Sequence, residues 1–365
     1  MNDFNARFGV FERLGERVEA PGEASVFLGI DSPGGRRIGP GESVPCSFDG
    51  RPCALGGIIR KGVSGMGWRY ALVAAMVGVM GQQGGAEGAW RPVNPDNLVL
   101  LDTMTGTVAI ELAPDAAPQH AAQFRTAVRS GVFEGEFFYR VVEGHVAQAG
   151  LEFEQRLVSW PELPLEAERT VAADGFVPLG NADLFAATAG HRDGFAAGRE
   201  GDQEWLLNCP GALGMARNEA PDTGAIEFFI PLASRRYLDR NYTVFGRVID
   251  GMDNVHRLKR VDPEDEANYP DLFENGETAS EAAFAARAAR LAGNEIVSMT
   301  LAADLPEAVR PAYEVMATQG ADWQALKTSK RDYSAIAAFV HTPPKVLDVC
   351  SLPVPARRVN AENDN

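Results

Sequence analysis

The segment Phe137-Phe-Tyr-Arg-Val-Val142, followed by Val146-Ala-Gln-Ala-Gly150, is the part of the chain that says most about the fold. Both stretches are short and rich in aromatic and β-branched residues, and Glu143-Gly144 separates them. This pattern is typical of two β-strands joined by a turn. Arg140 stands inside the first strand. An arginine there belongs by default to a solvent-facing side, so it indicates function only if other motifs accompany it.

Further short strands are expected on both sides of this pair. Leu98–Asp102 and Thr107–Leu112 have the pattern of a β-hairpin, because a turn at Met104-Thr-Gly106 separates them. Many short strands and few helices favour a barrel or a sandwich. The other expected strands are Ala212–Ala216, Glu227–Ile230, Val244–Val248 and Glu295–Leu301, and the expected helices are Pro118–Ser130 and Met252–Arg260.

Composition and charge exclude several classes of function. The 365 residues include 34 Lys and Arg against 50 Asp and Glu, which gives a net charge of -16. Such a chain repels phosphate backbones and anionic lipid surfaces, so we expect no nucleic-acid partner. The four cysteines and five histidines show no paired spacing that would place ligands around a metal ion. We therefore expect no metal site.

Several linked motifs occur in one order along the chain: Phe138-Tyr-Arg-Val-Val142 with Gln148-Ala-Gly150, Gly211-Ala-Leu-Gly-Met-Ala-Arg217, Phe228-Phe-Ile230, Tyr237-Leu-Asp239, Val244-Phe-Gly246 and Gly251-Met252. In this order they resemble the cyclophilin-type peptidyl-prolyl cis-trans isomerases. The resemblance implies a mainly β fold with helices over residues 90–301. In detail it implies a closed antiparallel β-barrel capped by two helices, with an inserted loop and extra C-terminal helices.

The resemblance also implies an activity, the acceleration of rotation about X-Pro bonds in polypeptide substrates, with Arg140 as the catalytic residue and no cofactor. Substrates would be proline-containing polypeptides, among them exported proteins during folding. The substrate-binding residues that the resemblance implies are His145, Val146, Gln148, Ala216, Arg217, Glu227, Phe229, Tyr237, Leu238 and Tyr242.

Several of these residues differ from those usual in the family. His145 stands where phenylalanine is usual, Glu227 where glutamine is usual, and Tyr237 where tryptophan is frequent. Val146, Ala149 and Tyr242 also differ. Because these changes alter the pocket, a second function stays open: a catalytically weak barrel that serves as a binding or chaperone module.

The N-terminal region has the features of a signal peptide preceded by extra residues. Residues 66–89 contain Arg69, the apolar run Tyr70–Gly81 and then small residues. The run is too short to cross a bilayer, so we expect no stable membrane insertion. Residues 1–65 are expected to be disordered or not translated, and the protein to be periplasmic or secreted. The alternative is a cytoplasmic protein with a disordered extension and a buried helix.

Three segments fall outside a minimal barrel. Residues 151–210 are interpreted as a long inserted loop, and residues 261–293 as an insertion with an alanine-rich helix near Thr278–Leu291. Asp304 and Asp322 are candidate helix N-caps, which predict two helices in a C-terminal extension over residues 302–356. The tail, residues 357–365, is expected to be disordered.

The cysteines bear on the compartment. If residues 1–89 are removed on export, Cys46 and Cys53 are lost, and Cys209 and Cys350 remain. We predict a disulfide between these two, and two separate buried thiols remain the alternative. The resemblance to an elongated, exported proteobacterial subgroup favours the disulfide. We expect a monomer.

Overall fold

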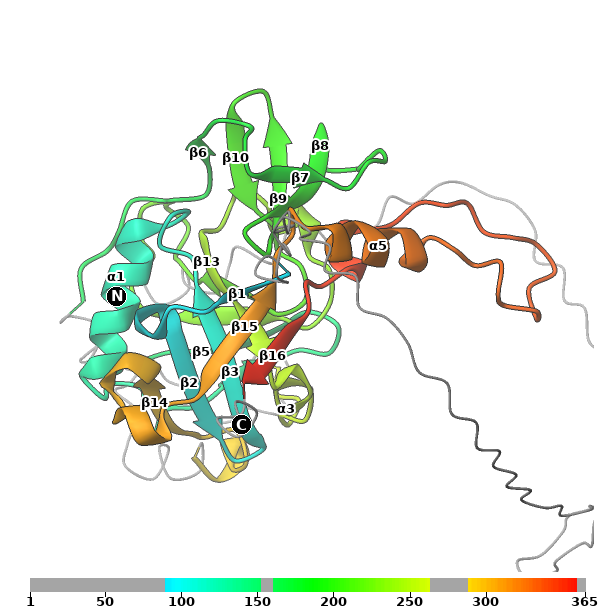
Figure 1. The fold of residues 1–365 in the computed structure, drawn as a ribbon. Coiled ribbons are helices and arrows are strands. Elements are labelled where there is room, and N and C mark those ends of the chain that lie inside the picture. Colours follow the sequence, from blue (N-terminus) through cyan, green and yellow to red (C-terminus); the bar gives the residue numbers. More distant parts are fainter. Residues whose placement is uncertain (1–88, 152–159, 263–287, 360–365) are drawn as a thin grey trace, which may run out of the picture. The chain divides into compact units, whose positions relative to one another are not determined.

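The computed structural model describes residues 89–151, 160–262 and 288–359, and an eight-stranded antiparallel sheet is its largest element (Figure 1). The strand order is β14-β2-β3-β13-β11-β12-β5-β4. The bounds are β2 (Leu98–Thr103), β3 (Gly106–Leu112), β4 (Arg140–Val141), β5 (Val146–Ala149), β11 (Ala212–Met215), β12 (Phe228–Pro231), β13 (Val244–Asp250) and β14 (Ile296–Leu301). The expected hairpin is β2 and β3, which pair along their whole length.

The sequence analysis predicted a closed barrel. The structure shows a curled sheet with two edge strands, β14 and β4. Within the described residues no strand ladder joins these ends. A single bridge pairs Phe137 with Glu295, and the backbone of Phe138 donates to the carbonyl of Asn294 at 2.9 Å. The outer edge of β4 pairs elsewhere, because Val141 and Val261 exchange backbone hydrogen bonds of 2.7 and 3.0 Å.

Two helices lie against the sheet. α1 (Pro118–Arg129) ends one residue before its expected limit and buries Phe124, whose ring contacts the rings of Phe133, Phe228 and Phe245 at centroid distances of 5.1–5.4 Å. These perpendicular and tilted aromatic contacts form the centre of the main core. α3 (Met252–His256) is four residues shorter than expected.

The interpretation of residues 151–210 as a loop is wrong for most of the insertion. It contains a second, five-stranded sheet in the order β6-β10-β9-β8-β7. In this sheet the fully buried Glu204 receives hydrogen bonds from Arg169, Arg192 and Arg199. The bounds are β6 (Arg169–Thr170), β7 (Phe176–Pro178), β8 (Thr188–Arg192), β9 (Phe195–Glu200) and β10 (Gln203–Leu206).

The C-terminal extension also differs from expectation, because it contributes strands as well as a helix. A three-stranded sheet has the order β1-β15-β16, and Asp304 bonds Arg129 instead of capping a helix. Asp322 lies in the first turn of α5, after its N-cap Gly320. The elements are β1 (Trp90–Pro92), η2 (Pro95–Asn97), η4 (Ala302–Asp304), η5 (Glu307–Val309), β15 (Ala312–Met316), α5 (Ala321–Lys330), η6 (Val349–Ser351) and β16 (Ala356–Val359).

The first residues of the expected tail are ordered in β16. Arg357 bonds Glu314 on the neighbouring strand, and its guanidinium lies 4.2 Å from the centre of the Trp90 ring. Residues 360–365, residues 1–88 with the expected signal peptide except Ala89, and most of the expected helix near Thr278–Leu291 lie outside the described residues.

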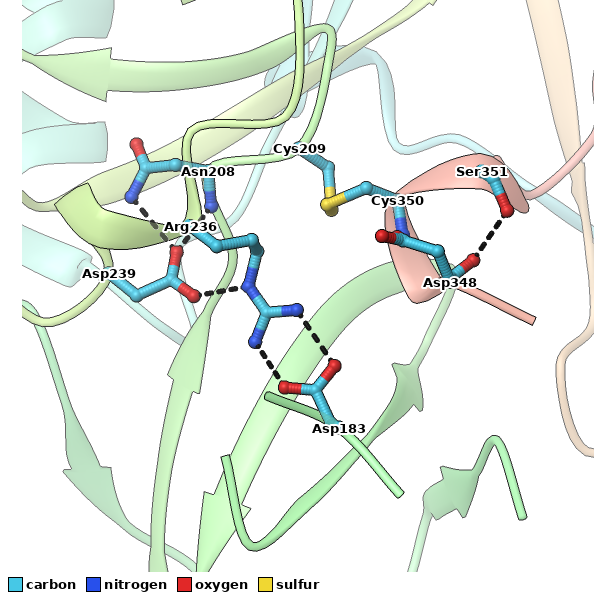
Figure 2. The surroundings of a disulfide bond; sticks show 8 residues. All are labelled: Asp183, Asn208, Cys209, Arg236, Asp239, Asp348, Cys350 and Ser351. Atoms are coloured by element: carbon cyan, nitrogen blue, oxygen red, sulfur yellow. Dashed lines mark hydrogen bonds and ion pairs between the residues drawn. A yellow bond between two sulfur atoms is a disulfide. The ribbon is translucent and has the colours of Figure 1, made fainter. Parts of the chain in front are cut away.

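The chain contains a disulfide between Cys209 and Cys350, which are 141 residues apart. Cys209 follows β10, and Cys350 lies in η6, so the bond ties the C-terminal extension to the inserted sheet (Figure 2). Both cysteines pack on a second core that includes Trp205, Tyr313 and Trp323.

Candidate active site

Arg140, Gln148 and Phe229 lie in register across three neighbouring strands. Arg140 on β4 is opposite Gln148 on β5, Gln148 is opposite Phe229 on β12, and Phe229 is opposite Gly214 on β11. Directly opposite residues of an antiparallel sheet point to the same face. The guanidinium, the amide and the phenyl ring therefore share one face, although 89 residues separate Arg140 from Phe229.

Gly214 makes room for the ring of Phe229. A Cβ atom at this position would overlap ring atoms of Phe229. The outer end of the ring therefore lies directly over Gly214, and any side chain at residue 214 would displace it. The glycine of the Gly-Ala-Leu-Gly-Met motif is thus explained by this close approach.

Phe229 belongs to a small apolar cluster separate from the main core. Val146, Phe229 and Leu238 are 3–6% exposed, and Ala216 and Tyr242 pack against them. The Phe229 and Tyr242 rings meet edge to face at 5.6 Å. We call these five residues the apolar cluster. Val146 lies in β5 and Phe229 in β12, Ala216 directly follows β11, and Leu238 and Tyr242 lie in the segment before β13.

Beside the cluster, one phenolic hydroxyl connects two polar side chains. Gln148 Nε2 donates to the Tyr139 hydroxyl at 2.5 Å, and this hydroxyl donates to Glu227 Oε2 at 2.9 Å. Burial, and then the neighbouring Glu227 carboxylate, raise the pKa of Tyr139 well above its usual value. The proton therefore stays on the hydroxyl, and the hydroxyl can donate to the carboxylate over the whole neutral range.

Glu227 is held on the same face by its neighbours. A Cβ atom at Gly150 would overlap the Glu227 side chain, so this side chain lies directly against Gly150, the residue after β5. The Glu227 carbonyl accepts a hydrogen bond from the backbone of Ala216. The carboxylate that replaces the usual amide therefore lies beside the register of Arg140, Gln148 and Phe229.

His145 lies in the turn between β4 and β5. Burial lowers the pKa of His145 to about 4, and the positive charges of Arg140 and Arg235 act in the same direction. The imidazole is therefore neutral at pH 7. The structure places His145 in the electrostatic environment of Arg140, and the apolar cluster does not include it.

Arg217 and Tyr237 lie at the border of the cluster. The Arg217 guanidinium is 4.7 Å from the centre of the Tyr242 ring, and its Nε donates to the carbonyl of Asn241. Tyr237 is 48% exposed and belongs to η3 (Arg236–Leu238), whose next residue, Leu238, enters the cluster.

Buried charges anchor η3. Arg236 binds both oxygens of Asp183 at 2.9 and 3.0 Å and Asp239 Oδ2 at 2.5 Å (Figure 2). Asp239 Oδ1 in turn accepts from the backbone of Asn208, the residue before Cys209. Hydrogen bonds from Arg236 lower the pKa of Asp183 although burial opposes this. The inserted sheet and the disulfide are therefore linked to the element that carries Tyr237 and Leu238.

The sequence analysis named most of this site but missed three contributors. Val146, Ala216, Phe229, Leu238 and Tyr242 come together in the apolar cluster, and Arg140, Gln148 and Glu227 lie beside them. Tyr139, Gly214 and Arg236, which position residues of the candidate site, were not named. Tyr139 and Gly214 stand inside motifs that the analysis quoted, so their position in the strands was a usable signal. Arg236 stands three residues before Asp239, but its other partner, Asp183, is 53 residues away, so the spacing of residues did not indicate that contact.

Comparison with known proteins identifies the family of the chain. Residues 98–273 match the family model described as cyclophilin type peptidyl-prolyl cis-trans isomerase/CLD. A probable peptidyl-prolyl cis-trans isomerase of Brucella suis is 33% identical over 168 residues, which cover 46% of this chain and 74% of the relative. A peptidyl-prolyl cis-trans isomerase of Acinetobacter baylyi is 30% identical over 171 residues, 46% of this chain and 73% of the relative.

A solved structure agrees with the sequence relatives. The cyclophilin AquaCyp293 from Hirschia baltica superposes with a TM-score of 0.58 at 27% sequence identity, covering 75% of this chain and 95% of that chain. That coverage exceeds the share of this chain that the Brucella and Acinetobacter relatives cover. From the matched family model and these relatives, the chain belongs to the cyclophilin-type peptidyl-prolyl cis-trans isomerase family.

Proposed function

We propose that the chain accelerates cis-trans isomerisation of X-Pro bonds in polypeptides. Arg140 is the catalytic hydrogen-bond donor, and the apolar cluster binds the proline ring. The register that puts Arg140, Gln148 and Phe229 on one face carries this proposal. It brings a permanent cation beside the apolar side chains that a pyrrolidine ring would contact.

The chemistry requires no nucleophile. Rotation about a peptide bond faces a barrier of about 18–20 kcal/mol, because the conjugation of the nitrogen lone pair must be broken. A donor that bonds the prolyl nitrogen or the moving carbonyl oxygen stabilises the twisted state more than either planar state. Arg140 supplies such a donor, and its rigid, always charged guanidinium keeps the geometry fixed. Gln148 orients the substrate backbone or Arg140.

Substitution of Arg140 tests the assignment. Arg140→Ala is expected to lower kcat/KM for an Ala-Pro peptide about 10²- to 10³-fold, the usual loss for one preorganised donor. Arg140→Lys keeps the positive charge but lacks the planar set of N–H donors of a guanidinium, so it should give an intermediate kcat/KM. Arg129→Ala, on the exposed face of α1, is the matched control and should match the wild type. Exchange spectroscopy or a protease-coupled assay measures the rates.

The alternative is a weakly catalytic binding or chaperone module, which the Glu227 carboxylate favours, because it bonds Tyr139, the residue before Arg140. A negative charge at this place competes with substrate carbonyls for the guanidinium. Equal rates for the wild type and Arg140→Ala would select this alternative. Binding of an unfolded polypeptide without isomerisation would then be direct evidence for a binding or chaperone module.

Export to the periplasm or the outside completes the proposal. The Cys209–Cys350 disulfide supports it, because such bonds persist in oxidising compartments. Residues 66–89 supply the expected signal. Among the described residues, no helix has the length and apolar character to cross a membrane. N-terminal sequencing of the mature protein tests this: a start after residue 80 is expected, and a start at Met1 would contradict export.

A further inference from the structure

The loop between β7 and β8 lies against the element that borders the apolar cluster. Asp183 in this loop binds the guanidinium of Arg236 through both carboxylate oxygens (Figure 2). The same carboxylate accepts hydrogen bonds from the backbone of Phe185 and Ala186, so the turn after Asp183 is fixed. The inserted sheet thereby presents one specific turn at η3.

This turn carries large apolar side chains on the surface. Leu184 is 95% exposed and Phe185 is 53% exposed, and the ring of Phe185 lies 5.3 Å from the Arg236 guanidinium carbon. The next residue of η3, Tyr237, is 48% exposed. We call Leu184, Phe185 and Tyr237 the apolar rim. Scattered exposed apolar residues are ordinary, but these three lie on two elements that the buried Asp183–Arg236 ion pair holds together.

We infer that the apolar rim binds apolar side chains of the unfolded polypeptide substrate, next to the proline that occupies the cluster. This inference rests on the proposed function and names its substrate class: extended chains with large apolar residues near the isomerised bond. The rim is continuous with the proposed site, because Tyr237 and Leu238 are consecutive residues of η3.

Preorganisation explains why such a rim would contribute to affinity. The Phe185 ring is held against a cation whose own position two carboxylates fix. A ring that is already ordered loses little conformational entropy when a substrate side chain packs on it. A short peptide that ends close to its proline would not reach the rim. A longer chain would.

The test compares short and long substrates. The variants are Leu184→Ser, which alters a side chain that is 95% exposed, and the double variant with Phe185→Ser. Met104→Ser, in the turn between β2 and β3 and 63% exposed, is the matched control. The substrates are an Ala-Pro tetrapeptide, a longer peptide with Leu and Phe flanking the same bond, and the same longer peptide with Ser flanks.

For the wild type we expect the apolar flanks to raise kcat/KM about tenfold over the serine flanks, mainly through KM, as the burial of one or two apolar side chains allows. Leu184→Ser should remove part of this gain and the double variant most of it, while the tetrapeptide rate stays constant. Met104→Ser should keep the whole gain.

Two results would overturn the inference. The first is an equal gain in kcat/KM from apolar flanks in the double variant and the wild type. The second is concentration-dependent self-association that the rim substitutions abolish, which would make the rim an interface between copies of the chain. Failure of the proposed function looks different. The wild type would then isomerise none of the three peptides, and weaker binding of the apolar peptide to the double variant would still be measurable by fluorescence anisotropy.

Discussion

At the residue scale, the Tyr139 hydroxyl is the link that fixes the direction of the Gln148 amide. With Nε2 bound to Tyr139, the amide oxygen of Gln148 must point elsewhere. Tyr139→Phe removes the hydroxyl but keeps the ring packing against Val261 and Leu291. We expect kcat/KM for an Ala-Pro peptide to fall about three- to tenfold, the worth of one hydrogen bond, with little change in the free energy of unfolding.

A matched substitution separates the orientation of Gln148 from the effect of the negative charge of Glu227. Glu227→Gln keeps an oxygen that can accept from Tyr139, so it should retain most of the activity that Tyr139→Phe loses. Assays of both variants and urea titrations distinguish the two effects. Full activity in Tyr139→Phe would show that the hydroxyl does not orient Gln148.

At the scale of elements, η3 depends on charges buried between it and the inserted sheet. Arg236→Met leaves the carboxylates of Asp183 and Asp239 without their cation, and breaking a buried ion pair in this way costs about 3–5 kcal/mol. We expect a loss of this order in the free energy of unfolding, together with a raised KM, because Leu238 follows on the same element. Denaturant unfolding and steady-state kinetics measure the two effects.

A neighbouring arginine provides the control. Arg240 pairs with Glu168, and its side chain is 44% exposed. Surface pairs of this kind contribute about 0–1 kcal/mol, so Arg240→Met should change stability little. Equal losses for the two variants would mean that burial of Arg236 does not govern the anchoring of η3.

At the scale of the whole molecule, His191 makes stability depend on pH. It is 1% exposed, and its ring packs against the ring of Trp323 at a centroid distance of 4.8 Å. Burial lowers the pKa of His191 to about 3, and Arg247 acts in the same direction. The unfolded chain, with a pKa near 6.5, therefore binds a proton that the folded chain rejects.

This difference in pKa determines how the free energy of unfolding changes with pH. Above pH 6.5, titration of His191 does not lower the free energy of unfolding. Between pH 6.5 and pH 3 the unfolded chain takes up a proton, so the free energy of unfolding falls by up to about 1.4 kcal/mol per pH unit. His191→Phe keeps a ring against Trp323 and removes the titration, so its stability should decline less between pH 6.5 and pH 4. Urea unfolding at several pH values provides the measurement. Parallel declines in the two proteins would exclude His191 as the source.

The residues of the candidate site were predictable because they stand in short linear motifs. Arg140, Gln148 and Phe229 belong to strands whose apolar pattern can be recognised within five or six residues. The inserted sheet was not predictable in this way. Its charged residues resemble a solvated loop in sequence, and only the folded chain brings Arg169, Arg192 and Arg199 around the buried carboxylate of Glu204.

The sequence alone determined the mainly β architecture, the family and the strands that carry Arg140 and Phe229, since strand propensity and motif order act over neighbouring residues. Tertiary structure alone decided the open ends of the main sheet, the Tyr139–Glu227 link, the anchoring of η3 and the position of the apolar rim. Each of these joins residues far apart in the chain, 88 for Tyr139 and Glu227 and 53 for Asp183 and Arg236. Nothing local encodes such a contact, because its free energy arises only after folding has removed both partners from water.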